Sequence, residues 1–398
     1  MRILITSLGY FKVYDHTGGG VDSYAYNLAN SIAQHGYEVH FIGKISRNLK
    51  NRNNENLIIH SIEKNSCPLD TTFFGWSKNY FLSNYDIYQY ATRIIKKYEF
   101  DLINSHGNVS ALFIYRNIKD KGGNNNLVYT FYNPSPDKFY FEKFHERIIR
   151  KAMFSLIEKP LWSRVNHIIA ISESLKKDLL SFNVDSKKVT VVPTGVDTNI
   201  FKKRDYNDKI LEKYDLPNYF CLFVGQLVKR KGVKYLLEAI KDIDFNLVVV
   251  GGGPQYEYLI NYAKKLKIIN KVHFLGSVPL SDLIHLYSMA KFFVYPSLAE
   301  GGNPTLAILE AMSCELPVIA TTASANPTAI KDGYNGFLVP PANVKELRDK
   351  INFFVENMNI CDRWGKNSRR IAKNKYDWKI IAGNTIKVFK KIVDGENL

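Results

Sequence analysis

The chain has 398 residues, of which 45% are hydrophobic and 23% are charged, as is typical of a soluble globular protein. One ordinary core does not support this length, so we predict two domains of roughly 150–200 residues each. No apolar run approaches the ~20 residues that a membrane-spanning helix needs. The amino-terminal MRILITSLGY has no small-residue cleavage site, so neither a membrane span nor a signal peptide is expected.

The formal net charge is +16, from 54 basic and 38 acidic residues. This balance attracts anions in general, and the spread of lysine over the whole chain fits an ordinary basic composition equally well. The four cysteines, Cys67, Cys221, Cys314 and Cys361, stand far apart and form no CxxC pair. We expect reduced, mostly buried thiols of a cytoplasmic protein, without a zinc site or a disulfide.

The first half of the chain alternates between apolar strand patterns and helical spacing. Strands are expected at residues 1–8, 38–43, 57–62, 101–107, 127–132, 166–172 and 189–193. Helices are expected at residues 21–35 and 87–98 and within 138–164. Ser172 precedes a further helical segment, and we give equal weight to a helix cap and to a site role for its hydroxyl.

Residues 198–218 are charged, polar and bounded by Pro217, which predicts an interdomain linker. Strands are then expected within 219–225, 246–254, 271–276, 291–296, 317–321 and 337–340, and helices at 232–240, 255–267, 280–290, 305–312 and 376–392. We therefore predict an α/β protein with two doubly wound domains, 1–197 and 219–375, each with a parallel sheet covered on both faces. Ligands should bind at the carboxyl ends of the strands, and the helix at 376–392 could cross back to the first domain.

The stretch from Pro296 to Val318 combines a strand end, a glycine-rich turn and a helix. Such an arrangement aims free backbone N–H groups and the positive end of a helix dipole at an anion. Glu310 lies one turn deep in the otherwise apolar TLAILEAM, and burying a carboxylate without a partner is costly. A phosphate at the turn and a hydroxyl-rich group beside Glu310 describe a nucleotide sugar, whereas a surface glutamate is the plain alternative.

A second candidate phosphate site is FVGQLVKRKG, residues 223–232. Its strand ends at Gly225, and the three cations Lys229, Arg230 and Lys231 directly precede a helix start. Cations beside a helix N-terminus can clamp a diphosphate, and arginine can bind it in bidentate fashion. A solvated basic loop is the alternative interpretation.

The motifs GQLVKRKG, VVVGGGP, FLGSV, EGGNPTLAILEAM, CELPVIAT and NGFLVPP resemble, in this order, retaining glycosyltransferases of the family-4 type. The first half of the chain also resembles this family, in the motifs GGGVDSYAYNLANSIAQHGYEVHFIG, DLINSHG, IIAISESLKKDL and VVPTGVD. The resemblance therefore covers nearly the whole chain. It implies the GT-B architecture, with two Rossmann-like domains facing a central cleft and the donor held mainly by the second. It also implies transfer of a sugar from a nucleotide-diphosphate sugar with retained configuration, without a metal or another cofactor.

The resemblance implies roles for single residues. Glu310 is similar to a glutamate that binds the donor ribose, Lys231 to a lysine that neutralises the diphosphate, and His106 to a histidine beside the transferred sugar. Gly19 and Gly20 match a glycine loop in which a missing Cβ lets the backbone approach the diphosphate or the acceptor. The other donor-binding residues that it implies are Gly225, Gln226, Arg230, Gly251, Val278, Gly302, Asn303, Thr305 and Leu306.

The chain departs from the family pattern at two positions. The family separates its two glutamates by seven residues, which points to position 302, but Gly302 stands there and the nearest glutamate is Glu300. We expect a longer turn to let Glu300 reach the same place and to act with Lys231 and His106 in catalysis; otherwise the sugar-side carboxylate is lost. Gln226 stands where arginine is common, so that Arg230 would supply the missing cation.

No DxD carboxylate pair sits at a strand end and no histidine cluster has metal-ligand spacing, so no metal site is expected. Three alternatives to a glycosyltransferase stay open: a nucleotide-sugar epimerase of the same fold, a non-catalytic nucleotide-sugar-binding subunit, and a dinucleotide-dependent oxidoreductase. The last is weakened because no strand is followed by G-x-G-x-x-G with an acidic residue about 20 positions on.

The stretch 138–164 carries five cations among aromatic and aliphatic residues, namely Arg147, Arg150, Lys151, Lys159 and Arg164. Its apolar face either packs on the first sheet, which we favour, or lies on an anionic membrane surface, which would suit a lipid-linked glycan acceptor. We expect a cytoplasmic enzyme that transfers a hexose-type sugar to a hydroxyl of a glycan or lipid-linked glycan. Peripheral contact with the inner membrane face stays open, no nucleic-acid partner is expected, and the sequence names neither the donor base nor the acceptor.

Overall fold

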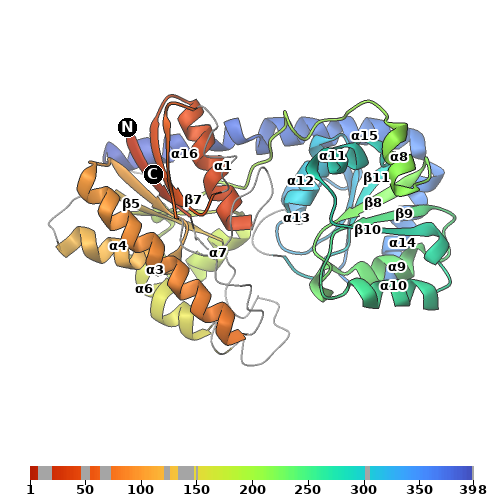
Figure 1. The fold of residues 1–398 in the computed structure, drawn as a ribbon, viewed down its shortest axis with the longest axis horizontal. Helices are drawn as coiled ribbons and strands as arrows, with labels where there is room; N and C mark the ends of the chain where they lie inside the picture. Colours follow the sequence, from red (N-terminus) through yellow and green to blue (C-terminus); the bar gives the residue numbers. More distant parts are fainter. Residues whose placement is uncertain are drawn as a thin grey trace. The chain divides into compact units, whose positions relative to one another are not determined.

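The computed structural model describes residues 1–7, 20–45, 54–62, 73–120, 126–132, 148, 151–300 and 305–396, without the side chains of 73–79 and 120. The chain divides into a first unit, Met1–Pro193 with Trp378–Leu398, and a second unit, Thr194–Asp377. Each unit combines a parallel sheet with helices on both of its faces (Figure 1). The prediction of two doubly wound α/β domains is confirmed.

The described strands of the first unit form one sheet in the order β3-β2-β1-β4-β5-β6-β7, and all their pairings are parallel. They are β1 (Arg2–Thr6), β2 (Glu38–Gly43), β3 (Leu57–Ser61), β4 (Leu102–Ser105), β5 (Asn126–Phe131), β6 (His167–Ala170) and β7 (Val189–Val191). The helices are α1 (Gly20–Gln34), α3 (Phe73–Lys97), α4 (Asn108–Asp120), α6 (Lys159–Arg164), α7 (Glu173–Ser181) and α16 (Trp378–Val393). Helices α1 and α16 lie on one face of the sheet and α3 and α4 on the other (Figure 1).

The described strands of the second unit form a parallel sheet in the order β10-β9-β8-β11-β12-β13. They are β8 (Phe220–Val224), β9 (Asn246–Val250), β10 (Val272–Gly276), β11 (Phe292–Tyr295), β12 (Val318–Thr321) and β13 (Gly336–Val339). The helices are α8 (Asp208–Tyr214), α9 (Val233–Ile240), α10 (Tyr256–Lys265), α11 (Leu280–Met289), α12 (Leu306–Ser313), α13 (Asn326–Ala329), α14 (Val344–Glu356) and α15 (Met358–Ile371). Helices α9, α10 and α14 cover one face of the sheet, and α11, α12 and α15 cover the other (Figure 1).

The strands read as continuous apolar runs because helices exclude water from both faces of each sheet. All four residues of β11, Phe292 to Tyr295, are fully buried. Burial of a large apolar side chain contributes about 1.5–3 kcal/mol relative to leaving it exposed. The two cores therefore hold the strand ends in fixed positions, and the loops at those ends carry the polar side chains.

The structure differs from the sequence predictions in the expected linker. Residues 198–218 belong to the second unit and contain α8, whose Ile210 and Leu211 are buried in the core of that unit. Because charged residues surround Ile210 and Leu211 in the sequence, the short amphipathic pattern of α8 was not recognised as a helix. At the other end of the chain α16 belongs to the first unit and lies against α1.

Other elements are longer than expected or were not predicted. Helix α3 begins at Phe73 rather than near Ile87, and α4, α13, α14 and α15 were not predicted. Helix α15 buries Cys361, Trp364 and Ser368 with helical spacing, but its many charges obscure this pattern. In the expected helix at 138–164, the structure describes Ile148 and the residues from Lys151 onward, with a π-helical turn at Phe154–Glu158 before α6.

The cysteine prediction can be compared with the structure at three of its four positions. Cys221, Cys314 and Cys361 are buried free thiols. Cys67 lies outside the described residues.

Candidate functional site

Polar side chains gather in the second unit where the neighbouring strands β8 and β11 end. After β8 the chain forms a single 3₁₀ turn, Lys229–Lys231, before α9 begins. Tyr295 is the last residue of β11, and Glu300 follows five residues later. Because β8 and β11 pair in parallel, their carboxyl ends meet at one edge of the sheet.

Lys231 and Glu300 form a buried ion pair at this edge. The Nζ of Lys231 lies 2.7 Å from Oε1 and 2.8 Å from Oε2 of Glu300, and it also donates to the hydroxyl of Tyr295. That hydroxyl in turn donates to Oε1 of Glu300 at 3.1 Å. Arg230 donates from Nη1 to Oε2 of Glu300 at 3.1 Å. The side chains of Lys231 and Glu300 are each only 7% exposed, so water does not screen the pair.

The electrostatics of Lys231 are set by its burial. Removal from water lowers the pKa of Lys231, the Glu300 carboxylate raises it, and the neighbouring Arg230 guanidinium lowers it again. Its ammonium also lies 5.0 Å from the centroid of the Tyr295 ring. A cation in this place can stabilise negative charge that develops on a leaving group.

Glycines let the backbone approach closely beside this cluster. Gly232, directly after the cations, has φ +69°, and a Cβ there would lie 2.0 Å from the carbonyl oxygen of Pro296. Gly251 has φ +130°, and a Cβ there would lie 2.0 Å from the carbonyl oxygen of Gly225. A Cβ at Gly225 would lie 3.7 Å from the ring of Tyr295. The predicted residues Gly225 and Gly251 therefore stand at the strand ends that border the ion pair.

Glu310 lies in α12, as the sequence predicted. Its Oε2 accepts a hydrogen bond of 2.9 Å from the hydroxyl of Tyr287 on α11. Burial raises the pKa of Glu310 to about 7, and the hydrogen bond from Tyr287 opposes this shift. The carboxyl group is therefore poised to change its charge near neutral pH.

The other predicted donor-binding residues of the second unit differ in exposure. Thr305 is the N-cap of α12 and, like Leu306, is half-buried. Gln226 is exposed, and Val278 is half-buried against the hydrophobic core. Gly302 and Asn303 lie outside the described residues.

In the first unit, His106 follows β4 and is 2% exposed. Its Nδ1 is hydrogen-bonded to the hydroxyl of Tyr132, and its Nε2 lies 2.9 Å from Oδ1 of Asn104. Because the amide nitrogen of Asn104 donates to Thr130 at 2.9 Å, the Asn104 oxygen accepts and His106 carries its proton on Nε2. Burial lowers the pKa of His106 to about 3, so its imidazole is neutral at neutral pH.

The expected roles of His106 and the amino-terminal glycines stay predictions. Gly20 is the exposed first residue of α1, and Gly19 lies outside the described residues.

Ser172 caps α7, with its hydroxyl accepting from the N–H of Leu175 at 3.3 Å. A hydrogen bond of this kind is the helix-cap alternative of the two that the sequence left open.

Sequence reasoning missed the tyrosines that hold the site residues. Tyr295, Tyr287 and Tyr132 contact Lys231, Glu310 and His106 respectively. Tyr295 and Tyr287 read as core residues of a strand and a helix, and both are indeed fully buried. A phenol at the end of an apolar strand such as KFFVYP is the one signal that could have indicated a polar neighbour.

The described residues show neither a metal-binding cluster nor a membrane-spanning helix. They contain no group of three or more His, Cys, Asp or Glu side chains arranged to hold a metal ion. Within the same part of the chain, no helix combines the length and apolar character needed to span a membrane.

Both halves of the chain match family models. Residues 18–200 match Glycosyltransferase Family 4, and residues 205–371 match Glycosyl transferases group 1. An uncharacterised glycosyltransferase of Methanocaldococcus jannaschii is 27% identical over 404 residues, which cover 99% of both chains. The family relationship therefore extends along the whole described fold.

Solved structures share the fold. Sucrose-phosphate synthase from Thermosynechococcus elongatus superposes with a TM-score of 0.78 at 20% identity, over 99% of this chain and all of the other. HepE from Anabaena, solved in complex with UDP-glucose, gives a TM-score of 0.71 at 19% identity, over 98% of this chain and all of HepE. From these matches and its two parallel-sheet units, the chain belongs to the family-4 type of GT-B glycosyltransferases.

Proposed function

We propose that the enzyme transfers a hexose-type sugar from a nucleotide-diphosphate sugar to a hydroxyl of a glycan or lipid-linked glycan, with retention of configuration and without a metal. The observation that carries this proposal is the buried cation Lys231, with Arg230 beside it, at the carboxyl ends of β8 and β11. A diphosphate leaving group needs cationic partners in such a water-poor place. The complex of HepE with UDP-glucose supports a donor of this class.

In this mechanism each residue has a limited task. Lys231 and Arg230 stabilise the charge that develops on the departing diphosphate, and Glu310 accepts a hydrogen bond from a ribose hydroxyl. The acceptor hydroxyl itself is the nucleophile: its oxygen bonds to C1 of the sugar as the C1–O bond to the diphosphate breaks. The hydroxyl proton passes to the departing diphosphate oxygen, so the protein need supply neither a nucleophile nor a base. His106, neutral and held by Tyr132, would orient the transferred sugar rather than exchange protons with it.

The proposal is tested with a panel of UDP-, GDP- and ADP-hexoses, by measuring binding and the release of nucleotide in the presence of glycan acceptors. Lys231→Ala should lose about 2–4 kcal/mol of transition-state stabilisation in kcat/KM with the accepted donor. Lys234→Ala is the matched control, because Lys234 lies on α9 with a side chain 45% exposed. EDTA should leave the rate unchanged. Donor binding without any transfer would favour the non-catalytic subunit, and interconversion of free nucleotide sugars would favour the epimerase.

Phe154, Leu161 and Trp162 are buried in the core of the first unit, which supports the favoured packing of the apolar face of 138–164 on that unit. We further propose a cytoplasmic location, with contact between the exposed side of this stretch and an anionic membrane surface when the acceptor is lipid-linked. The net charge of +16 supports this. So do Leu156 and Lys159, because Leu156 is 74% exposed and Lys159 follows it closely in the chain.

A further inference from the structure

The ammonium group of Lys231 has all of its hydrogen-bond donors in use. A lysine ammonium carries three N–H groups and no acceptor. In Lys231 they meet Oε1 of Glu300, Oε2 of Glu300 and the hydroxyl of Tyr295. A phosphate oxygen can therefore bind Lys231 only when one of these partners leaves.

Glu300 is the partner that an anion would replace. Its carboxylate is surrounded by Lys231, Arg230 and the hydroxyl of Tyr295, which is also the surrounding that a phosphate group prefers. A carboxylate and a diphosphate at one cation repel each other, and in a buried place this repulsion is weakly screened. The two anions therefore compete for the same cations.

Hydrogen bonds hold the backbone on both sides of this cluster. The N–H of Leu298 donates to the carbonyl of Arg230 at 2.7 Å, which joins the turn after β8 to the segment after β11. The N–H of Glu300 donates to the hydroxyl of Ser324 at 3.2 Å, and that hydroxyl donates back to the carbonyl of Glu300 at 2.6 Å. The backbone can thus stay in place while the side chain of Glu300 moves.

We propose that Glu300 is an exchangeable internal anion, which occupies Lys231 and Arg230 in the donor-free enzyme and leaves them when the donor diphosphate binds. The inference rests on the proposed function for the class of ligand. It explains how a buried lysine remains charged without a donor, since an unpaired buried cation is strongly destabilising. It also means that the apparent affinity for any diphosphate is reduced by the fraction of molecules in which Glu300 holds the cations.

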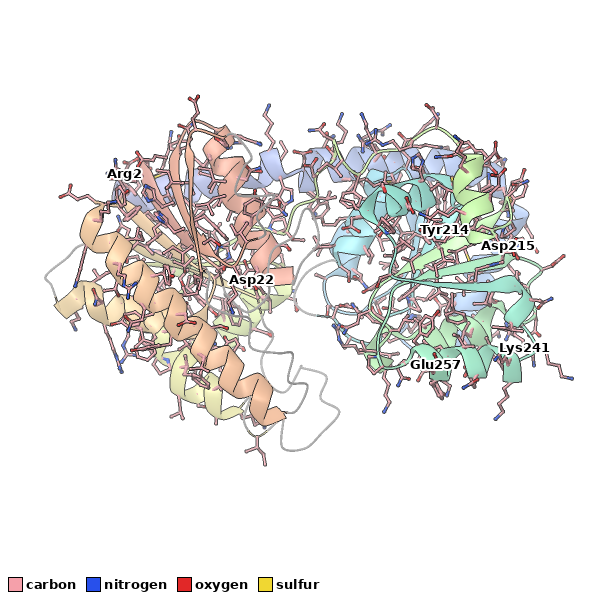
Figure 2. All side chains as sticks on the ribbon, in the orientation of Figure 1. Arg2, Asp22, Tyr214, Asp215, Lys241 and Glu257 are labelled. Carbon is pink, nitrogen blue, oxygen red and sulfur yellow. The ribbon has the colours of Figure 1, made fainter. Side chains whose placement is uncertain are left out.

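The test is the affinity of purified enzyme for inorganic pyrophosphate and for UDP, GDP and ADP, measured by isothermal titration calorimetry. Glu300→Gln keeps the shape of the side chain and removes its charge. The variant should therefore bind each diphosphate that the wild type binds with an affinity at least about tenfold higher. Glu257→Gln is the matched control, because Glu257 is exposed on α10 (Figure 2) and should leave the affinity unchanged. In the double variant Glu300→Gln/Lys231→Ala the gain should disappear.

Unchanged or weaker diphosphate binding by Glu300→Gln, in a variant that remains folded by circular dichroism, overturns the inference. Should that variant not fold, Glu300→Asp, which keeps the charge but shortens the side chain, should bind diphosphate more tightly than the wild type, and failure to do so also overturns it. Sugar transfer by the wild type is a separate readout. If the wild type transfers sugar but Glu300→Gln does not bind diphosphate more tightly, the proposed function stands and the inference about Glu300 fails. If Glu300→Gln binds diphosphate more tightly but the wild type transfers no sugar, the inference about Glu300 stands and the proposed function fails.

Discussion

The carboxyl group of Glu310 carries a cost to folding stability, and we propose that it also binds the donor ribose. Removal of the carboxyl group from water raises its pKa from 4.5 to about 7, and the hydrogen bond from the hydroxyl of Tyr287 partly opposes this shift. Between these pH values the folded chain keeps a proton that the unfolded chain has released. The contribution of this group to stability is therefore greatest at low pH and falls as the pH rises through this window.

We predict that Glu310→Gln removes this pH dependence, because glutamine resembles the protonated glutamic acid and does not titrate. The melting temperature of the wild type minus that of the variant should be lower at pH 8 than at pH 5, measured without donor in the same buffer series. Glu257→Gln, exposed on α10, provides the comparison and should give a difference that does not vary with pH. A constant difference for Glu310→Gln as well would show that the carboxyl group titrates at its ordinary pKa.

At the scale of elements, the turn between β8 and α9 depends on Gly232. This residue has a left-handed backbone conformation and packs directly against the carbonyl of Pro296, at the end of β11. A side chain there would be strained by its φ and would also collide with backbone, which cannot move aside as a flexible side chain can. The turn that carries Arg230 and Lys231 is therefore specified by close approach as well as by conformation.

Gly232→Ala should accordingly destabilise the protein by more than about 3 kcal/mol, or prevent folding. The loss is this large because the added Cβ clashes with the backbone and the residue is also strained by its positive φ. The control is Gly333→Ala, because Gly333 has nearly the same φ of +71° but no atom within 4 Å of the added Cβ. That variant should lose only about 1–2 kcal/mol. Urea unfolding of both variants measures the difference, and equal losses would mean that Pro296 moves away at little cost.

At the scale of the whole molecule, the net charge of +16 is large enough to affect where the protein binds. Each cation near an anionic membrane surface contributes about 1 kcal/mol, and salt screens this attraction. The cations of 138–164 are the ones that the sequence groups with apolar residues. Residues 148 and 151–164 of that stretch are described by the structure, and a binding measurement in solution tests what its cations do.

Co-sedimentation with anionic liposomes should show binding at low salt that is lost at high salt. Changing Arg147, Arg150 and Lys151 to Glu should abolish it, because the change reverses the charge next to the apolar residues. The same charge change at Lys241, Lys264 and Lys265, which are exposed in the second unit, should retain most of the binding. An absence of binding at low salt would contradict the membrane proposal, and equal losses in both variants would show that only total charge matters.

Much of this protein followed from local patterns in its sequence. Apolar runs bounded by Gly and Pro predicted all thirteen strands that the structure describes, because a buried parallel strand needs continuous apolar residues and a turn at each end. The same reasoning placed Lys231 before a helix and Glu310 within one. Helices α4, α8, α14 and α15 were missed because their charged residues weaken a periodic signal that only packing makes evident.

Tertiary structure alone decided which residues meet. Lys231 and Glu300 are 69 positions apart, and Glu310 and Tyr287 are 23 apart, so no local pattern relates them. Parallel pairing of β8 with β11 brings the first pair together, and the burial that follows sets the pKa of Lys231. The sequence by itself thus determined which chemical groups follow the strands. The order of the strands in the sheet determined which of these groups come into contact and form an ion pair.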